Sequence, residues 1–156
     1  MKKIELGQAI GIIANLGVIA GIIFLGVELR QNNAFLQAQA GYALSQNRAN
    51  NNELLKSSPQ FAALLVKLER GEQLTREEQY QEHGIYMSFF TNWAWEYGEF
   101  RANRLNDAQL PVTVWRALAN GHGPIPTPRI RETWESSKAY LNSEFVEFME
   151  AEIFGE

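Results

Sequence analysis

The sequence predicts an all-α protein in which one N-terminal transmembrane helix continues into a long polar stalk, followed by a small helical bundle. Three observations predict this architecture. Residues 9–27 carry no charge, residues 28–56 contain no proline, and the remaining apolar residues recur at helical spacing without strand-like alternation. The expected organisation is a membrane anchor at residues 1–28, an amide-rich helical stalk at 29–56 and a helical bundle domain at 57–156.

The charge-free segment has the length of a membrane span. Nineteen residues at the helical rise of about 1.5 Å cover roughly 29 Å, close to the hydrocarbon thickness of about 30 Å. Two alternatives stay open. A buried core helix seldom runs so long without a polar side chain on one face. A cleaved signal peptide would account for Lys2 and Lys3, but its apolar region usually spans only about 7–15 residues. We therefore expect this segment to contact membrane lipid.

Small residues share one face of this segment. At about 100° per residue they fall within an arc of about 120°. These residues are Gly7, Gly11, Ala14, Gly17 and Gly21. Small residues four apart let helix backbones approach closely in lipid, and Asn15 beside the arc can hydrogen-bond a neighbouring helix. The alternative explanation is that glycine is common in transmembrane helices. We expect a homo-oligomer, or a contact with another membrane protein, through this face.

Basic residues give the expected orientation of the span. Lys2 and Lys3 precede it, and Arg30 is the base that follows it closely. Because cytoplasmic flanks carry the excess of Lys and Arg, the N-terminus is expected in the cytoplasm, with the bulk of the chain across the membrane.

The stalk is polar but almost uncharged. Ten of the 22 residues from 31 to 52 are Asn or Gln, and Arg48 is the one charge among them. A seam at 3-4 spacing runs through Leu29, Asn33, Leu36, Ala40, Ala43 and Asn47. Asparagine at such positions fixes register in a coiled coil, so a parallel bundle of stalks could extend the interface through Asn33 and Leu36. The alternative is a surface helix packed on its own domain through Leu36, Tyr42 and Leu44.

Helix-start signals divide the bundle domain. Ser58 and Pro59 start a helix that ends at Gly71, and Thr75 with Glu78 forms a capping box for a long helix over about 76–104. Three further starts follow. They are Asn106 or Asp107 before a shorter helix, Thr127 after the loop 121–126, and Ser143 before the last segment.

The long helix carries an aromatic stripe. Its 4-3-4-3 spacing places five rings on one face. These rings belong to Tyr86, Phe90, Trp93, Tyr97 and Phe100. Such a stripe is more often core than binding site. A pocket for a lipid or a small apolar molecule is the alternative.

Little in the sequence indicates catalysis. There is no cysteine, and the two histidines, His83 and His122, lack the spacing of a metal site. Glu96 and Glu99 are expected to be solvated. A net charge of −4 disfavours nucleic-acid binding. We therefore predict no catalytic residues, no metal and no cofactor; a histidine acting with a carboxylate is the enzyme alternative.

Four segments resemble an uncharacterised bacterial family of single-span membrane proteins with a C-terminal helical domain. They are FLGVELRQN at 24–32, EFRANRL at 99–105, RETWE at 131–135 and FVEFM at 145–149. The family often has two consecutive tryptophans where this chain has Thr133 and Trp134. The resemblance implies a bacterial inner-membrane protein and this architecture, and it carries no activity.

The favoured hypothesis is a non-catalytic single-pass membrane protein that acts as a scaffold or accessory subunit, by self-assembly or partner binding. The alternative is a membrane-tethered sensor or binding module with an apolar pocket on the aromatic helix.

Overall fold

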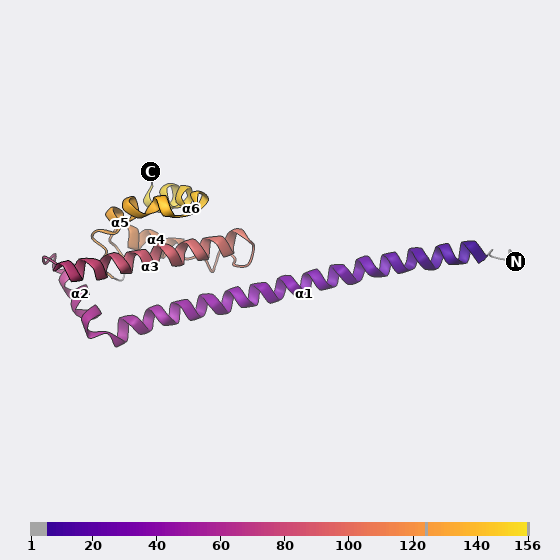
Figure 1. The fold of residues 1–156 in the computed structure, drawn as a ribbon, viewed down its shortest axis with the longest axis horizontal. Helices are drawn as coiled ribbons and strands as arrows, with labels where there is room; N and C mark the ends of the chain where they lie inside the picture. The colour runs from indigo at the N-terminus through magenta and orange to yellow at the C-terminus, as the bar shows by residue number, and fades with distance from the viewer. Residues whose placement is uncertain (1–5, 124, 156) are drawn as a thin grey trace. The chain divides into compact units, whose positions relative to one another are not determined.

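The computed structural model describes residues 6–123 and 125–155 (Figure 1). Over these residues the chain is all-α, as predicted, with six α-helices, a short 3-10 helix, a π-helix and no strand. Contacts within the chain divide it into two compact units, Met1–Gln39 and Ala40–Glu156. Lys2 and Lys3 lie outside the described residues.

Helix α1 (Leu6–Ser57) is continuous over 52 residues. No proline interrupts it, and Gly41 is the only glycine of α1 after the apolar segment. Every backbone N–H after the first turn can therefore find its helical acceptor. The predicted run of the apolar segment into a polar helix is confirmed.

The second unit begins inside α1, at Ala40, whereas the sequence predicted a bundle that starts at residue 57. The difference has a packing cause. Ala40 and Leu44 are buried and form a small apolar cluster with Leu105, against which Trp95 and Phe100 pack. The predicted stalk therefore packs on the bundle at Ala40, Leu44 and Arg48.

The other helices are short except for α3. They are α2 (Pro59–Glu69), α3 (Arg76–Arg101), α4 (Val112–Ala119), α5 (Ile130–Ser137), the 3-10 helix η1 (Lys138–Tyr140), α6 (Ser143–Phe148) and the π-helix η2 (Met149–Phe154).

Two predicted helix starts are present as expected. The Ser58 hydroxyl accepts a hydrogen bond from the Phe61 N–H at 3.2 Å, with Pro59 in the first turn of α2. In the capping box of α3, Thr75 Oγ1 accepts from the Glu78 N–H at 3.2 Å, and Glu78 Oε2 accepts from the Thr75 N–H at 2.9 Å. Each bond satisfies a backbone group that a helix end leaves unpaired.

Other predicted boundaries move by a few residues. Helix α3 ends at Arg101 and not near residue 104. Asn106 does not cap α4; it exchanges two hydrogen bonds with Gln109 within the preceding loop. The last start is capped by Asn142, whose Oδ1 accepts from two backbone N–H groups, and not by Ser143.

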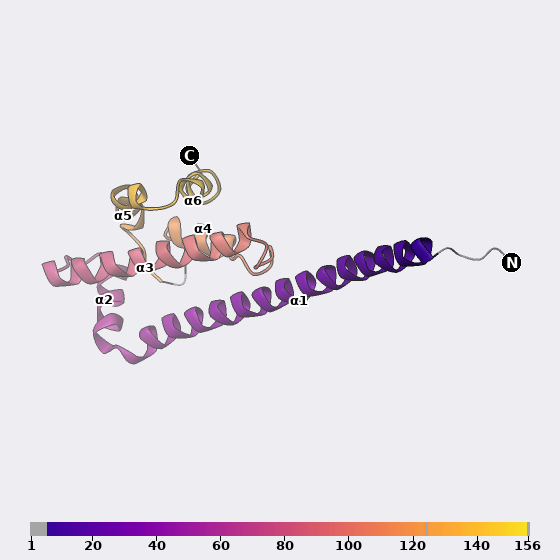
Figure 2. The ribbon, with the colours of Figure 1, turned by 45° about the vertical axis from the view of Figure 1, so that its right-hand side comes forward.

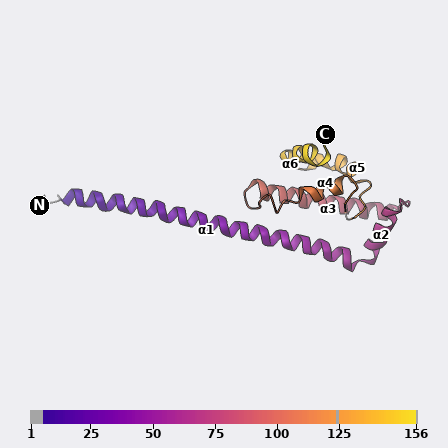
Figure 3. The same cartoon turned by 180° about the vertical axis from the view of Figure 1, so that it is seen from behind.

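The core of the second unit is built on α3. In all three views α5 and α6 lie on the same side of α3 (Figures 1, 2 and 3). Trp115 of α4 stacks on Trp93 with ring centroids 5.3 Å apart, and Trp134 of α5 meets Phe90 edge to face at 5.1 Å. Such pairs stabilise a fold by about 0.5–1.5 kcal/mol each beyond the area they bury.

Candidate functional site

The side chains of the apolar segment of α1 are largely exposed. None of its most apolar 18-residue window is buried, and it is the one described helix long and apolar enough to cross a membrane. The predicted interface residues Gly7, Gly11, Ala14, Asn15, Gly17 and Gly21 are all exposed. A Cβ added to any of these four glycines would meet no atom within 4 Å. The backbone of this face is therefore open to an approaching helix.

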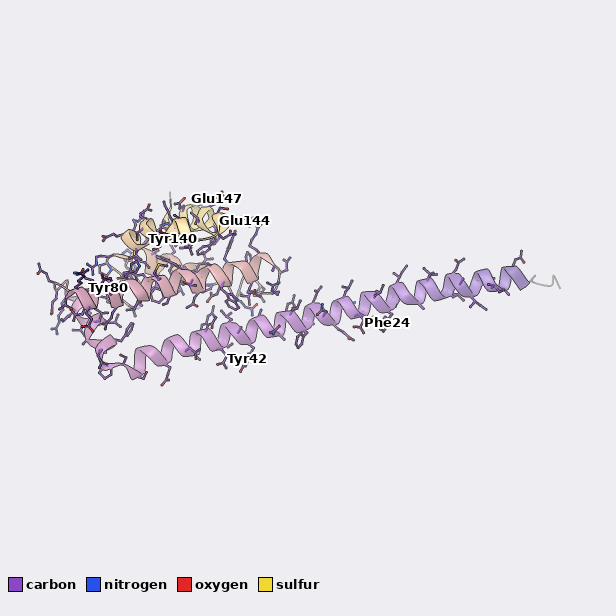
Figure 4. The ribbon with its side chains drawn as sticks, in the orientation of Figure 1. Phe24, Tyr42, Tyr80, Tyr140, Glu144 and Glu147 are labelled. Atoms are coloured by element: carbon purple, nitrogen blue, oxygen red, sulfur yellow. The ribbon has the colours of Figure 1, made fainter. Side chains whose placement is uncertain are left out.

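The two ends of the stalk seam differ in burial. Asn33 is exposed and Leu36 is half-buried, so their assignment to an oligomer interface stays a prediction. From Ala40 onward the alternative holds, because Ala40 and Leu44 pack on the chain's own bundle. Tyr42, expected in that contact, is instead 67% exposed and projects from α1 (Figure 4).

A charged contact accompanies this apolar one. Arg48 of α1 donates through Nη2 to the Gln109 carbonyl oxygen at 3.0 Å, and the same atom lies 3.6 Å from Glu96 Oε2. Glu96 was expected to be solvated, but its side chain is only 7% exposed and its Oε2 accepts no hydrogen bond from a described residue. Burial raises the pKa of Glu96, and the nearby Arg48 guanidinium opposes that shift.

The aromatic stripe is core. Tyr86, Phe90, Trp93 and Tyr97 are buried in the main apolar cluster, and Phe100 packs against it. The clefts described below are lined by other residues. The apolar ligand pocket on this helix stays a prediction.

A buried polar cluster lies beside the first half of the stripe. Glu82 of α3 is 4% exposed and accepts hydrogen bonds from Tyr86 Oη, at 2.8 Å, and from Arg129 Nη2. Burial, followed by the hydrogen bond to Glu82, raises the pKa of the Tyr86 hydroxyl. The bond to Glu82 also raises the pKa of Arg129. The Tyr86 hydroxyl is thereby held in its neutral form and the Arg129 guanidinium in its charged form.

The same residues border a groove of about 220 Å³ between α3 and α5. We call it the Arg129 groove. It is lined by Gln79, Glu82, His83, Arg129, Glu132, Thr133 and Ser136. A second cleft of about 430 Å³ shares Gln79 and Arg129 with it, and a third of about 330 Å³ shares Gln79 and His83. The three hollows thus adjoin along the N-terminal half of α3.

The two histidines differ. His83 is exposed and lies in this groove with Glu82 and Glu132, which is the neighbourhood that the enzyme alternative needs. His122 is exposed in the loop after α4 and lines none of these clefts. Among the described residues, no group of three or more His, Asp or Glu side chains is placed to hold a metal ion.

Sequence reasoning missed Glu82, Arg129 and the buried state of Glu96. A signal for Glu82 was present, because it precedes Tyr86 by four residues and so falls on the buried stripe. A charge at a core position demands a partner. Arg129, 47 residues further on, could not be identified as that partner from local spacing.

No protein family matches this chain, and no curated protein or solved structure is detectably similar to it. The resemblance to a bacterial single-span family therefore stays a prediction.

Proposed function

We propose that this chain is a single-pass protein of the bacterial inner membrane, with its N-terminus in the cytoplasm, and that it acts by self-assembly or by binding a membrane partner and not by catalysis. The observation that supports this proposal is the uncovered apolar segment of α1.

Large apolar side chains project from this segment in every direction. Eleven of them between Ile10 and Val27 are 47–69% exposed. The Phe24 ring is one of these exposed side chains (Figure 4). A helix that belongs to a soluble core buries one face on its own domain. Because none of its most apolar window is buried, a lipid bilayer or another helix is the cover that we propose.

The open small-residue face supports assembly over simple anchoring. Lipid tails are as apolar as the helix, so association in a bilayer depends on close packing and on interhelical hydrogen bonds. The glycines of this face allow the first, and the exposed Asn15 amide can supply the second.

Cysteine cross-linking in membranes tests the assembly. The chain has no cysteine, so each introduced thiol is unique. We expect Ala14→Cys and Gly21→Cys to form disulfide-linked dimers on mild oxidation. Ile23→Cys is the matched control, because Ile23 is 63% exposed and lies on the face opposite the small-residue arc. Equal cross-linking at all three positions, or none at any, would contradict the proposed interface.

Thiol labelling tests the orientation. The Tyr140 side chain is 86% exposed, so Tyr140→Cys should react with a membrane-impermeant maleimide added outside intact spheroplasts. Labelling that requires lysis would place the bundle in the cytoplasm and reverse the proposed topology.

A further inference from the structure

In the Arg129 groove, the Arg129 guanidinium is held in place by a buried carboxylate. Glu82 is almost fully buried and binds Arg129 through Nη2, while Tyr86 Oη occupies the other oxygen of the carboxylate. A carboxylate with both oxygens engaged fixes the position of the arginine that it binds. Arg129 thus has a defined orientation before any ligand arrives.

Most of the hydrogen-bonding capacity of Arg129 is unused. A guanidinium carries five N–H donors in a planar fork. The bond to Glu82 is the one hydrogen bond that the Arg129 guanidinium makes within the described part of the chain. The Arg129 side chain is 41% exposed and lines both the groove and the adjoining cleft. A carboxylate in the groove can therefore bind it in the forked geometry.

The groove also holds an acidic group without an ionic partner. Glu132 is exposed at the start of α5 and makes no ion pair within 4.0 Å with a described residue. The His83 imidazole and the Ser136 hydroxyl lie on the same walls. One groove thus presents an available cationic fork and an available carboxylate.

This pair of charges selects the class of ligand. A simple anion on Arg129 would be repelled by Glu82 and Glu132, and a simple amine on Glu132 would leave the unused donors of the Arg129 fork unsatisfied. A molecule that carries both charges satisfies both groups. The volume of about 220 Å³ is below the roughly 300–1,000 Å³ of sites for drug-sized ligands, so the molecule is small.

We infer that the Arg129 groove binds a free α-amino acid, with the ligand carboxylate on Arg129 and its ammonium group on Glu132. The amino acid side chain extends into the adjoining cleft, which Leu68, Leu74 and Pro128 help to line. This site does not depend on the proposed self-assembly.

Calorimetric titration of the full-length protein in detergent micelles, with each of the twenty free amino acids, tests the inference. We expect at least one to bind with a Kd below about 1 mM. Its N-acetyl derivative lacks the ammonium charge and its amide lacks the carboxylate. Each should bind at least about tenfold more weakly, as expected when a charged partner is lost.

Two variants and one control locate the site. Glu132→Gln removes an exposed charge without breaking a pair, and we expect about tenfold weaker binding. Arg129→Lys keeps a charge beside Glu82 but loses the fork, and we expect a similar loss. Glu147→Gln, on exposed Glu147 of α6 (Figure 4), is the matched control and should leave the Kd unchanged. Tryptophan fluorescence during urea unfolding shows whether each variant is folded.

Three results would overturn the inference. The first is that no amino acid binds at about 10 mM. The second is that the N-acetyl derivative binds as tightly as its parent, which would make the groove a simple carboxylate site. The third is that Glu147→Gln weakens binding as much as Glu132→Gln, which would show an effect of overall charge. Because none of these measurements reports oligomerisation, their failure is separate from failure of the proposed assembly.

Discussion

Removing Arg129 should destabilise the bundle far more than removing an exposed arginine. In Arg129→Ala, Glu82 stays buried with a side chain 4% exposed and loses its cationic partner. Breaking a buried pair in this way costs about 3–5 kcal/mol. Tyr86 continues to donate at 2.8 Å, and water can enter the vacated site, because the Arg129 side chain is 41% exposed. We therefore expect a loss near the lower end, about 3 kcal/mol.

Urea unfolding followed by tryptophan fluorescence measures this loss. Trp93, Trp115 and Trp134 are buried in the core of the second unit, so their emission reports its unfolding. With a slope of about 1–3 kcal/mol/M, a loss of about 3 kcal/mol moves the midpoint down by about 1–3 M. The measurement is made on the full chain in detergent, without added amino acids.

Two further variants make the result decisive. Arg70→Ala breaks a pair with Glu72 whose side chains are 69% and 44% exposed, and should cost less than about 1 kcal/mol. Adding Glu82→Gln to Arg129→Ala removes the uncompensated charge and should recover part of the loss. If Arg129→Ala costs no more than Arg70→Ala, or if Glu82→Gln recovers nothing, the reasoning about a buried, arginine-dependent carboxylate is refuted.

Three more predictions concern single positions. The raised pKa of Glu96 means that the folded state binds its proton more tightly than the unfolded state, so this group lowers stability as the pH rises above the ordinary glutamate range. Glu96→Gln should therefore stabilise the bundle by about 1 kcal/mol at pH 7, and urea midpoints should show the gain shrinking toward pH 4; a gain independent of pH would contradict this. A Cβ at Gly123 would lie 2.9 Å from Leu118 Cγ, so Gly123→Ala should lower the urea midpoint by an equivalent of about 1–3 kcal/mol, and an unchanged midpoint would show that the loop yields freely. Ser58→Ala removes the cap of α2 and should cost about 1 kcal/mol by the same assay, with Ser58→Gly costing less.

The local features of the fold could be predicted from the sequence. The continuous α1 follows from a charge-free segment joined to residues without proline, and the capping box of α3 is complete within residues 75–78. The aromatic stripe is core because its 4-3 spacing requires one buried face. In each case the deciding residues lie within a few helical turns of one another.

Features that join distant segments could not be read in the same way. Only Ala40 of the 3-4 seam of the stalk is buried, while Leu29 and Asn33 are exposed, and spacing does not say what covers such a seam. The structure places Leu105 on Ala40 and Leu44, where a second copy of the stalk was also a sound expectation. Glu96 was assigned to solvent because its partner, Arg48, lies on another helix. The spacing of residues can predict that one face of a helix is covered, but only the tertiary structure shows which residues cover it.

The ion pairs of α3 help to determine which segments pack against this helix, and in which register. Four glutamates of this helix each meet a cation from a different part of the second unit. The pairs are Glu78 with Lys67, Glu82 with Arg129, Glu96 with Arg48, and Glu99 with Arg104. The first and last are partly exposed and so contribute little to stability. The two middle carboxylates are more than nine-tenths buried, so a competing arrangement that left either one without its arginine would carry a desolvated charge. If α1 or the segment before α5 moved along α3 by one turn, about 5.4 Å, Arg48 or Arg129 would be separated from its glutamate. The buried glutamates penalise that movement, and they therefore fix the register of Arg48 and Arg129, and with it the shape of the Arg129 groove.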